Sequence, residues 1–125
     1  MIVLDASVLI AHLDERDAQH ERAVEELLAA ADEAFGCSPI TRAEVLVGPA
    51  RTGRLDVAEA ALVTLGVDDV SLGSDAPARL AVLRAATPLK LPDCCVLLAA
   101  QDAAASRVVT FDEQLARAAG TLGLS

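Results

Sequence analysis

The most constraining feature of the chain is an uncharged run, Cys94–Ala100, that directly follows an acidic residue. Pro92 and Asp93 precede the run. Both suit the first turn of a helix, because proline loses no hydrogen bond there and the helix dipole favours an anion. A helix with seven consecutive uncharged residues has no polar face and must be buried on most sides. We therefore predict a buried helix over Pro92–Ala105, with one carboxylate at its mouth that is either a cap or a ligand.

Short apolar runs alternate with helical patterns along the rest of the chain. Because strands and helices alternate, the sequence predicts an α/β fold with a parallel sheet. Gly48–Pro49 is expected to distort or end one helix. On another, Val24, Leu27, Leu28 and Ala31 have the spacing of a buried face. The predicted strands are 2–4, 34–38, 67–72 and 107–110, and the predicted helices are 6–13, 18–32, 41–50, 55–65, 75–86, 92–105 and a last one from residue 112.

Length, charge and cysteine content narrow the class of protein. The 125 residues predict a single domain, 1–125, with its own hydrophobic core. The net charge of −9 argues against a broad surface that follows phosphates, and an anionic substrate would need a cation to mediate the contact. Cys37, Cys94 and Cys95 have no metal-clip spacing, so we expect small buried side chains in a reducing, cytoplasmic setting. We expect no secretory signal and no membrane span.

Four acids lie at junctions between predicted elements: Asp5, Glu44, Asp93 and Asp112. Ligands of open α/β sheets gather at the carboxyl ends of the strands, and all four acids can reach that edge. Carboxylates that converge repel one another unless a cation joins them. Ligands that are all oxygen suit Mg²⁺ or Mn²⁺, which activate water and neutralise phosphate charge. The pattern therefore favours hydrolysis of a phosphodiester.

Each acid also has a purely structural interpretation. Glu44 could complete a capping box with Thr41, Asp93 could compensate the helix dipole, and Asp112 could be an N-cap. Asp5 is harder to explain in this way, because it ends a buried strand and has no basic residue near it in sequence. Asp102 falls on the opposite helix face from Asp93 and is expected at the solvated surface. His12 and His20 lack the paired arrangement of a metal-free nuclease and are not expected to be catalytic.

Four segments in chain order resemble the PIN domain family, specifically VapC-type toxins of bacterial toxin–antitoxin systems. The opening strand ends in Asp5, with Ser7 two residues later, as in that family. Glu44 resembles the second family acid, and Leu91–Asp93 before an Ala/Leu-rich helix resembles the third. The segment Val108–Asp112 resembles the closing strand with its threonine and fourth acid. The resemblance covers the whole chain.

The resemblance implies a three-layer α/β/α fold with a small central parallel sheet of four to five strands. It implies a Mg²⁺- or Mn²⁺-dependent endoribonuclease that acts on RNA as the toxin of a toxin–antitoxin pair. The implied metal-binding and catalytic residues are Asp5, Glu44, Asp93 and Asp112. Ser7 and Thr110 would be supporting polar groups, although each could equally cap an adjacent helix start. The implied partners are a second copy of the chain and a small cognate antitoxin that covers the active site.

Two features of the sequence depart from this expectation. Gln114 stands where the family often has a further acid, so a second metal is not implied. The net charge also requires positive charge to be concentrated near the site. Candidate phosphate ligands are Arg42, Arg51, Arg54, Lys90 and Arg107, each of which could instead be solvated or paired with a carboxylate.

Two other functions are compatible with the same residues. One is a PIN-like protein-interaction module with weak catalysis, and the other is a metal-dependent DNA nuclease or phosphatase on the same scaffold. Leu9 and Leu13, on the first predicted helix, are candidates for a dimer or antitoxin surface.

Overall fold

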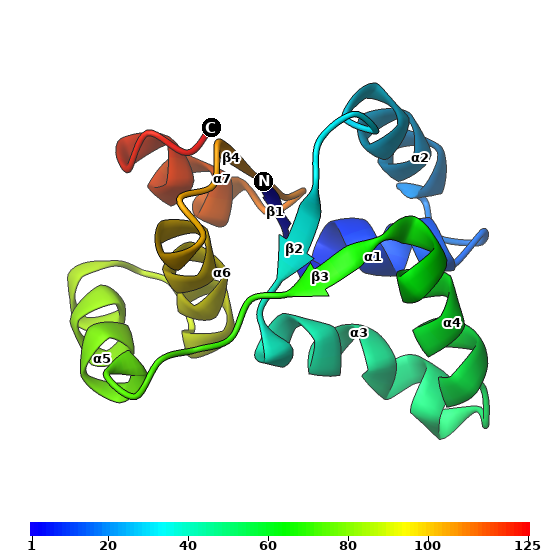
Figure 1. The fold of residues 1–125 in the computed structure, drawn as a ribbon, viewed down its shortest axis with the longest axis horizontal. Helices are drawn as coiled ribbons and strands as arrows, with labels where there is room; N and C mark the ends of the chain where they lie inside the picture. Colours follow the sequence, from blue (N-terminus) through cyan, green and yellow to red (C-terminus); the bar gives the residue numbers. More distant parts are fainter.

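The computed structural model describes all 125 residues and contains four short strands and seven helices (Figure 1). The sheet has the strand order β3-β2-β1-β4, and every pair is parallel. The predicted α/β class is therefore confirmed. The elements are β1 (Ile2–Leu4), α1 (Ala6–Leu13), α2 (His20–Ala29), β2 (Phe35–Cys37), α3 (Pro39–Arg51), α4 (Leu55–Leu65), β3 (Val67–Asp69), α5 (Ala76–Ala86), α6 (Leu91–Asp102), β4 (Arg107–Val109) and α7 (Glu113–Thr121).

The two faces of the sheet carry separate hydrophobic clusters. Successive residues of a strand point to opposite faces, so Ile2 and Leu4 lie on one side and Val3 on the other. The first cluster contains residues of α1–α4, and the second contains residues of α6 and α7, with α5 packed against it. Figure 1 shows α1–α4 to one side of the sheet and α5–α7 to the other. The structure thus has three layers, with four strands in the middle.

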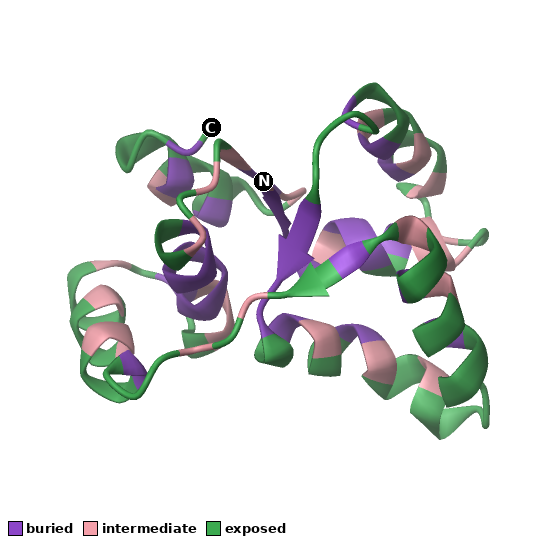
Figure 2. Cartoon of the chain, viewed as in Figure 1, coloured by how far each residue is buried: buried purple, intermediate pink, exposed green.

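The central helix α6 is buried as predicted. All seven residues of Cys94–Ala100 are at most 3% exposed, and α6 is the most continuously buried helix in Figure 2. Its start at Leu91 places Pro92 and Asp93 in the first turn. All three cysteines are free and buried, which confirms their interpretation as small core residues. No helix of the chain is both long and apolar enough to cross a membrane.

Helix α3 differs from the prediction at both ends. Its N-cap is Ser38, whose Oγ accepts a hydrogen bond from the Thr41 N–H at 3.1 Å. Thr41 therefore already lies inside the helix, and the predicted capping box with Glu44 is wrong. Gly48–Pro49 was expected to distort or end the helix, and α3 ends at Arg51, two residues after Pro49. The missing Pro49 N–H affects only the last turn, where the Pro49 carbonyl itself accepts two backbone hydrogen bonds.

Candidate metal centre

Asp5 follows the carboxyl end of β1 and is the most firmly held of the four acids. The residue is only 5% exposed, and its side chain does not cap α1. The hydroxyls of Ser7 and Thr110 both donate to the same carboxylate oxygen, Oδ2, each at 2.7 Å. The other oxygen, Oδ1, accepts no hydrogen bond and is not sealed from solvent. Asp5 therefore presents one fixed oxygen and one oxygen free for a ligand.

Ser7 and Thr110 also connect Asp5 to the backbone that follows β4. The Ser7 Oγ accepts from the Phe111 N–H at 3.0 Å, and the Thr110 Oγ1 accepts from the Asp112 N–H at 3.0 Å. A hydroxyl has one proton, so these acceptor roles leave each proton directed at Asp5. The contacts extend beyond local capping of the neighbouring helix starts. They fit the supporting role that the resemblance implies for both residues.

Asp112 is the N-cap of α7, as its structural interpretation predicted. Its Oδ1 accepts from the Leu115 N–H at 2.9 Å, whereas its Oδ2 accepts no hydrogen bond within the chain. The Asp112 charge also acts on Asp93 and helps to raise the pKa of that carboxyl. Asp112 therefore both caps α7 and lies beside the other acids.

Glu44 lies on α3 and is free of any capping role, because Ser38 caps that helix. Burial raises the pKa of the Glu44 carboxyl, and the charges of Asp5 and Asp93 raise it further. The side chain is thus close enough to both acids for their charges to interact, although Glu44 itself remains largely accessible.

Asp93 lies in the first turn of α6, where the helix dipole alone would lower a carboxyl pKa. The pKa of Asp93 is instead raised, first by burial and then by the charges of Asp5 and Asp112. A backbone hydrogen bond from Lys90 and the Lys90 charge lower it, but do not outweigh these effects. Dipole compensation therefore does not account for Asp93. Its charge links Glu44, Asp5 and Asp112 into one connected group.

None of the four acids has a cationic partner in the chain. The ion pairs of the structure use other acids, namely Asp14, Asp69, Asp75 and Asp102. Nor do three ligating side chains converge closely enough to hold an ion as they stand. The accessible Glu44 and Asp93 side chains would have to rotate toward Asp5. An all-oxygen donor set, a free Asp5 oxygen and unbalanced negative charge fit Mg²⁺ or Mn²⁺.

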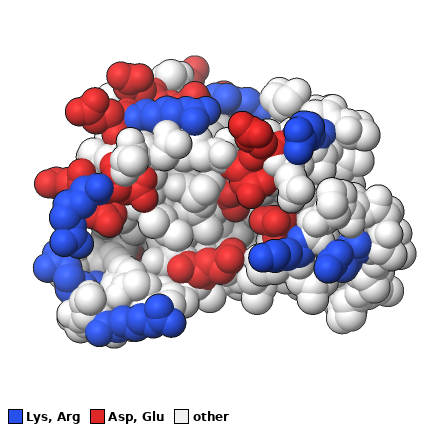
Figure 3. Space-filling model, turned by 180° about the vertical axis from the view of Figure 1, so that it is seen from behind, with Lys and Arg blue, Asp and Glu red and all other residues white.

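Two charged residues have structural roles, and for Arg42 this is the carboxylate pairing that the sequence analysis gave as its alternative. Arg42, a candidate phosphate ligand, donates to Asp69 at 2.7 Å and to the Val67 carbonyl at 2.8 Å. Asp102 was expected to be only solvated, but it pairs with Arg79 at 2.7 Å and ties α6 to α5. On the face in Figure 3, acidic side chains lie near the centre and at the upper left, with basic side chains interspersed between and beside them. On that face, no continuous basic surface is seen.

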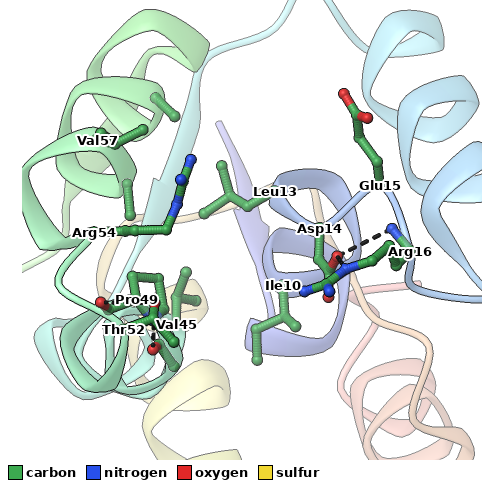
Figure 4. Close-up of a pocket in the computed structure, with 13 residues that line it drawn as sticks. Ile10, Leu13, Asp14, Glu15, Arg16, Val45, Pro49, Thr52, Arg54 and Val57 are labelled. Atoms are coloured by element: carbon green, nitrogen blue, oxygen red, sulfur yellow. Dashed lines mark hydrogen bonds and ion pairs between the residues drawn. The ribbon is translucent and has the colours of Figure 1, made fainter.

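A separate cavity of about 760 Å³ lies between the end of α1 and the α3–α4 hairpin (Figure 4). Leu13 points into this cavity, opposite Val57 and Arg54. Leu9, which the sequence placed with Leu13 on a possible partner surface, is fully buried, so that expectation is wrong for Leu9. Its side chain belongs to the core between α1 and the sheet. The cavity contains none of the four acids.

The protein is an α/β/α sandwich with a parallel sheet. It carries acidic side chains without cationic partners near the ends of its strands. Residues 2–121 match the family model described as PIN domain, and the chain belongs to that family. The family that the four sequence segments suggested is thereby confirmed. No curated protein sequence matches the chain at a significant level.

Solved structures similar to the chain include components of toxin–antitoxin systems. A toxin–antitoxin complex from Klebsiella pneumoniae has a TM-score of 0.76 at 26% identity, covering 100% of this chain and 96% of that one. VapC20 of Mycobacterium tuberculosis, described as a toxin that cleaves the sarcin–ricin loop, has a TM-score of 0.76 at 18% identity, with 94% and 95% coverage. VapBC2 of Rickettsia felis, bound to a promoter DNA fragment, has a TM-score of 0.68 at 16% identity, with 94% and 92% coverage.

Proposed function

We propose that the protein is a metal-dependent endoribonuclease and the toxin of a toxin–antitoxin pair. The observation that carries the proposal is the state of Asp5. It is a buried carboxylate with no cation, held through one oxygen by Ser7 and Thr110 and free at the other. Three further acids without ion pairs act on it or on one another electrostatically. Such an arrangement is costly unless an ion binds there.

Each residue of the site has a distinct task in this proposal. Asp5, Glu44, Asp93 and Asp112 would hold Mg²⁺ or Mn²⁺, which when bound supplies a water of lowered pKa and neutralises phosphate charge. Ser7 and Thr110 fix Asp5 Oδ2 and so aim Oδ1 at the open side. Asp112 also starts α7, which ties its position to that of the helix.

The comparisons support the choice of RNA and of an antitoxin partner. VapC20 is described as cleaving the sarcin–ricin loop, which favours RNA as the substrate here. The Klebsiella pneumoniae relative was solved as a toxin–antitoxin complex, which favours a small antitoxin as a partner. A homodimer and a cytoplasmic location belong to the same proposal.

The proposal is tested by cleavage assays on the parent and on a matched pair of variants. Asp93→Asn removes one charge of the site, and Asp102→Asn removes one from the same helix outside the site. RNA, single-stranded DNA and a phosphomonoester are each incubated with Mg²⁺, with Mn²⁺ or with a chelator. We expect cleavage of RNA that needs the metal. We also expect Asp93→Asn to cleave RNA more slowly than the parent by roughly 100-fold or more. Mutating residues that only support the metal ligands already lowers metal affinity or activity by about 10–100-fold.

Specific outcomes would contradict the proposal. Cleavage by Asp93→Asn at the rate of Asp102→Asn would mean that the acids do not form the active site. Metal-dependent cleavage of DNA or of the phosphomonoester, with RNA left intact, would favour a DNA nuclease or a phosphatase on the same scaffold. A parent that cleaves nothing in the presence of either metal would favour a protein-interaction module.

A further inference from the structure

A cavity of about 190 Å³ lies along the outer edge of β4, between α2 and α7. Its wall includes the residues of β4 together with Arg22, Glu26, Thr110 and Phe111. Thr110 is the residue whose hydroxyl donates to Asp5, so the cavity adjoins the acid site directly. None of the roles described so far uses this space.

One wall of the cavity is an arginine stacked on an aromatic ring. The Arg22 guanidinium carbon lies 4.4 Å from the centre of the Phe111 ring, a cation–π contact between α2 and the segment after β4. Phe111 packs against the core and its N–H donates to Ser7, so the ring is fixed relative to the acid site. Arg22 pairs with no carboxylate and keeps its charge available.

A second wall is the outer edge of β4, the last strand of the sheet, which pairs with no other strand but is partly covered by the C-terminal segment. The Val109 carbonyl accepts from the Asp5 N–H and so points inward to β1, whereas the Val108 N–H points outward and donates to the Leu124 carbonyl. By the alternation of a strand, the Val108 C=O and the Thr110 N–H also point outward. The cavity is therefore lined by one backbone acceptor and one backbone donor.

Charge favours an anionic ligand here in spite of the acidic chain. Arg22 and Arg107 line the cavity, Glu26 is the only acidic side chain of the lining, and Ser125 lies there as well. Unpaired bases of RNA are recognised by stacking on aromatic rings or arginine planes and by hydrogen bonds to their polar edges. Their phosphates are met by arginine. The cavity combines all three features beside the carboxylates.

We propose that this cavity binds one unpaired nucleobase of the RNA strand. The base stacks on the Arg22–Phe111 pair, its polar edge meets the Val108 C=O and the Thr110 N–H, and Arg107 faces the adjoining phosphate. The inference rests on the proposed ribonuclease function and extends it from the cleavage site to the recognition of a base.

The test compares binding of two fluorescent probes, a short mixed-sequence single-stranded RNA and a ribose-phosphate oligomer of the same length without bases. Both are titrated against the protein carrying Asp93→Asn, which prevents cleavage, and fluorescence anisotropy gives Kd. Arg22→Gln and Phe111→Leu are added to this background. Arg117→Gln, on the exposed side of α7, is the matched control. Thermal melting checks that Phe111→Leu, which touches the core, is folded.

We expect Arg22→Gln and Phe111→Leu each to weaken RNA binding about tenfold, the effect of losing one stacked base. Binding of the base-free oligomer should change much less, and Arg117→Gln should change neither. Equal weakening of both probes would overturn the subsite, because Arg22 would then contact only the backbone. If the parent cleaves RNA but Arg22→Gln and Phe111→Leu bind RNA with the same Kd as Arg117→Gln, the base subsite is overturned and the proposed ribonuclease function is not. Parent protein that neither binds nor cleaves RNA would overturn the proposed function as well.

Discussion

Replacing Thr110 with valine should destabilise the protein through two hydrogen bonds made by one hydroxyl. The Thr110 Oγ1 donates to the charged Asp5 Oδ2 at 2.7 Å and accepts from the Asp112 N–H at 3.0 Å. A hydrogen bond to a charged group contributes about 1.5–3 kcal/mol and a neutral one about 0.5–1.5 kcal/mol. Thr110 is half-buried and Ser7 still donates to the same Asp5 oxygen, so we expect the lower end, about 2 kcal/mol in total.

A loss of this size should be visible in thermal unfolding followed by circular dichroism. At about 4 °C per kcal/mol for a chain of this length, Tm should fall by about 8 °C. Valine keeps the β-branched shape of threonine, so the change isolates the hydroxyl. Thr110→Ser, which restores a hydroxyl, should recover most of the loss.

Thr121→Val is the matched control. Its hydroxyl bonds only the Arg117 carbonyl on the exposed surface of α7, so we expect a change below about 0.5 kcal/mol. A Thr110→Val protein as stable as Thr121→Val would refute the reasoning, because Thr110 would then not hold Asp5 in solution.

Two further predictions concern the acids and the start of α3. A carboxyl whose folded pKa is raised holds its proton more tightly when folded, so its contribution to stability is lost as pH rises through the folded pKa. Asp93→Asn should therefore raise Tm in metal-free buffer at pH 7, and this gain in Tm should vanish below the ordinary carboxyl pKa. An unchanged or lower Tm at pH 7 would contradict the repulsion of Asp93 by Asp5 and Asp112. Ser38→Ala removes the cap of α3 and should cost about 1–2 kcal/mol in urea unfolding; a loss no larger than that of an exposed serine such as Ser71 would show that the cap contributes little.

The main features of the fold, and the candidate residues of the site, could be predicted because they follow from short segments of the sequence. Ile2–Leu4 and Cys94–Ala100 are buried on both sides, so they contain no polar residue that would obscure the pattern. Asp5 was identifiable because a charge directly after such a run is unusual. The prediction that the four acids lie near one another came from the geometry of parallel sheets, in which the strands end at one edge that helix starts can also reach.

Side-chain contacts between distant segments could not be predicted. Thr110 donates to Asp5 across 105 residues, and Arg22 covers Phe111 although the sequence shows it only on a polar helix face. On α2, the predicted buried face included Leu28, which is 70% exposed, whereas Ala23, Leu27 and the C-cap residue Ala30 are buried. Small alanines let α2 approach its neighbours closely, and spacing alone does not distinguish two stripes that are one residue apart.

The central claim, that the four acids form a metal site, is tested most directly by melting temperature with and without Mn²⁺. The parent is compared with Asp5→Asn, which is nearly the same shape but neutral, and with Asp102→Asn as the control. At 100 times its Kd, a ligand stabilises the folded state by about 2.7 kcal/mol, which corresponds to about 11 °C here. The account predicts this rise for the parent and for Asp102→Asn and none for Asp5→Asn. Equal shifts in all three proteins, or no shift in the parent, would contradict it.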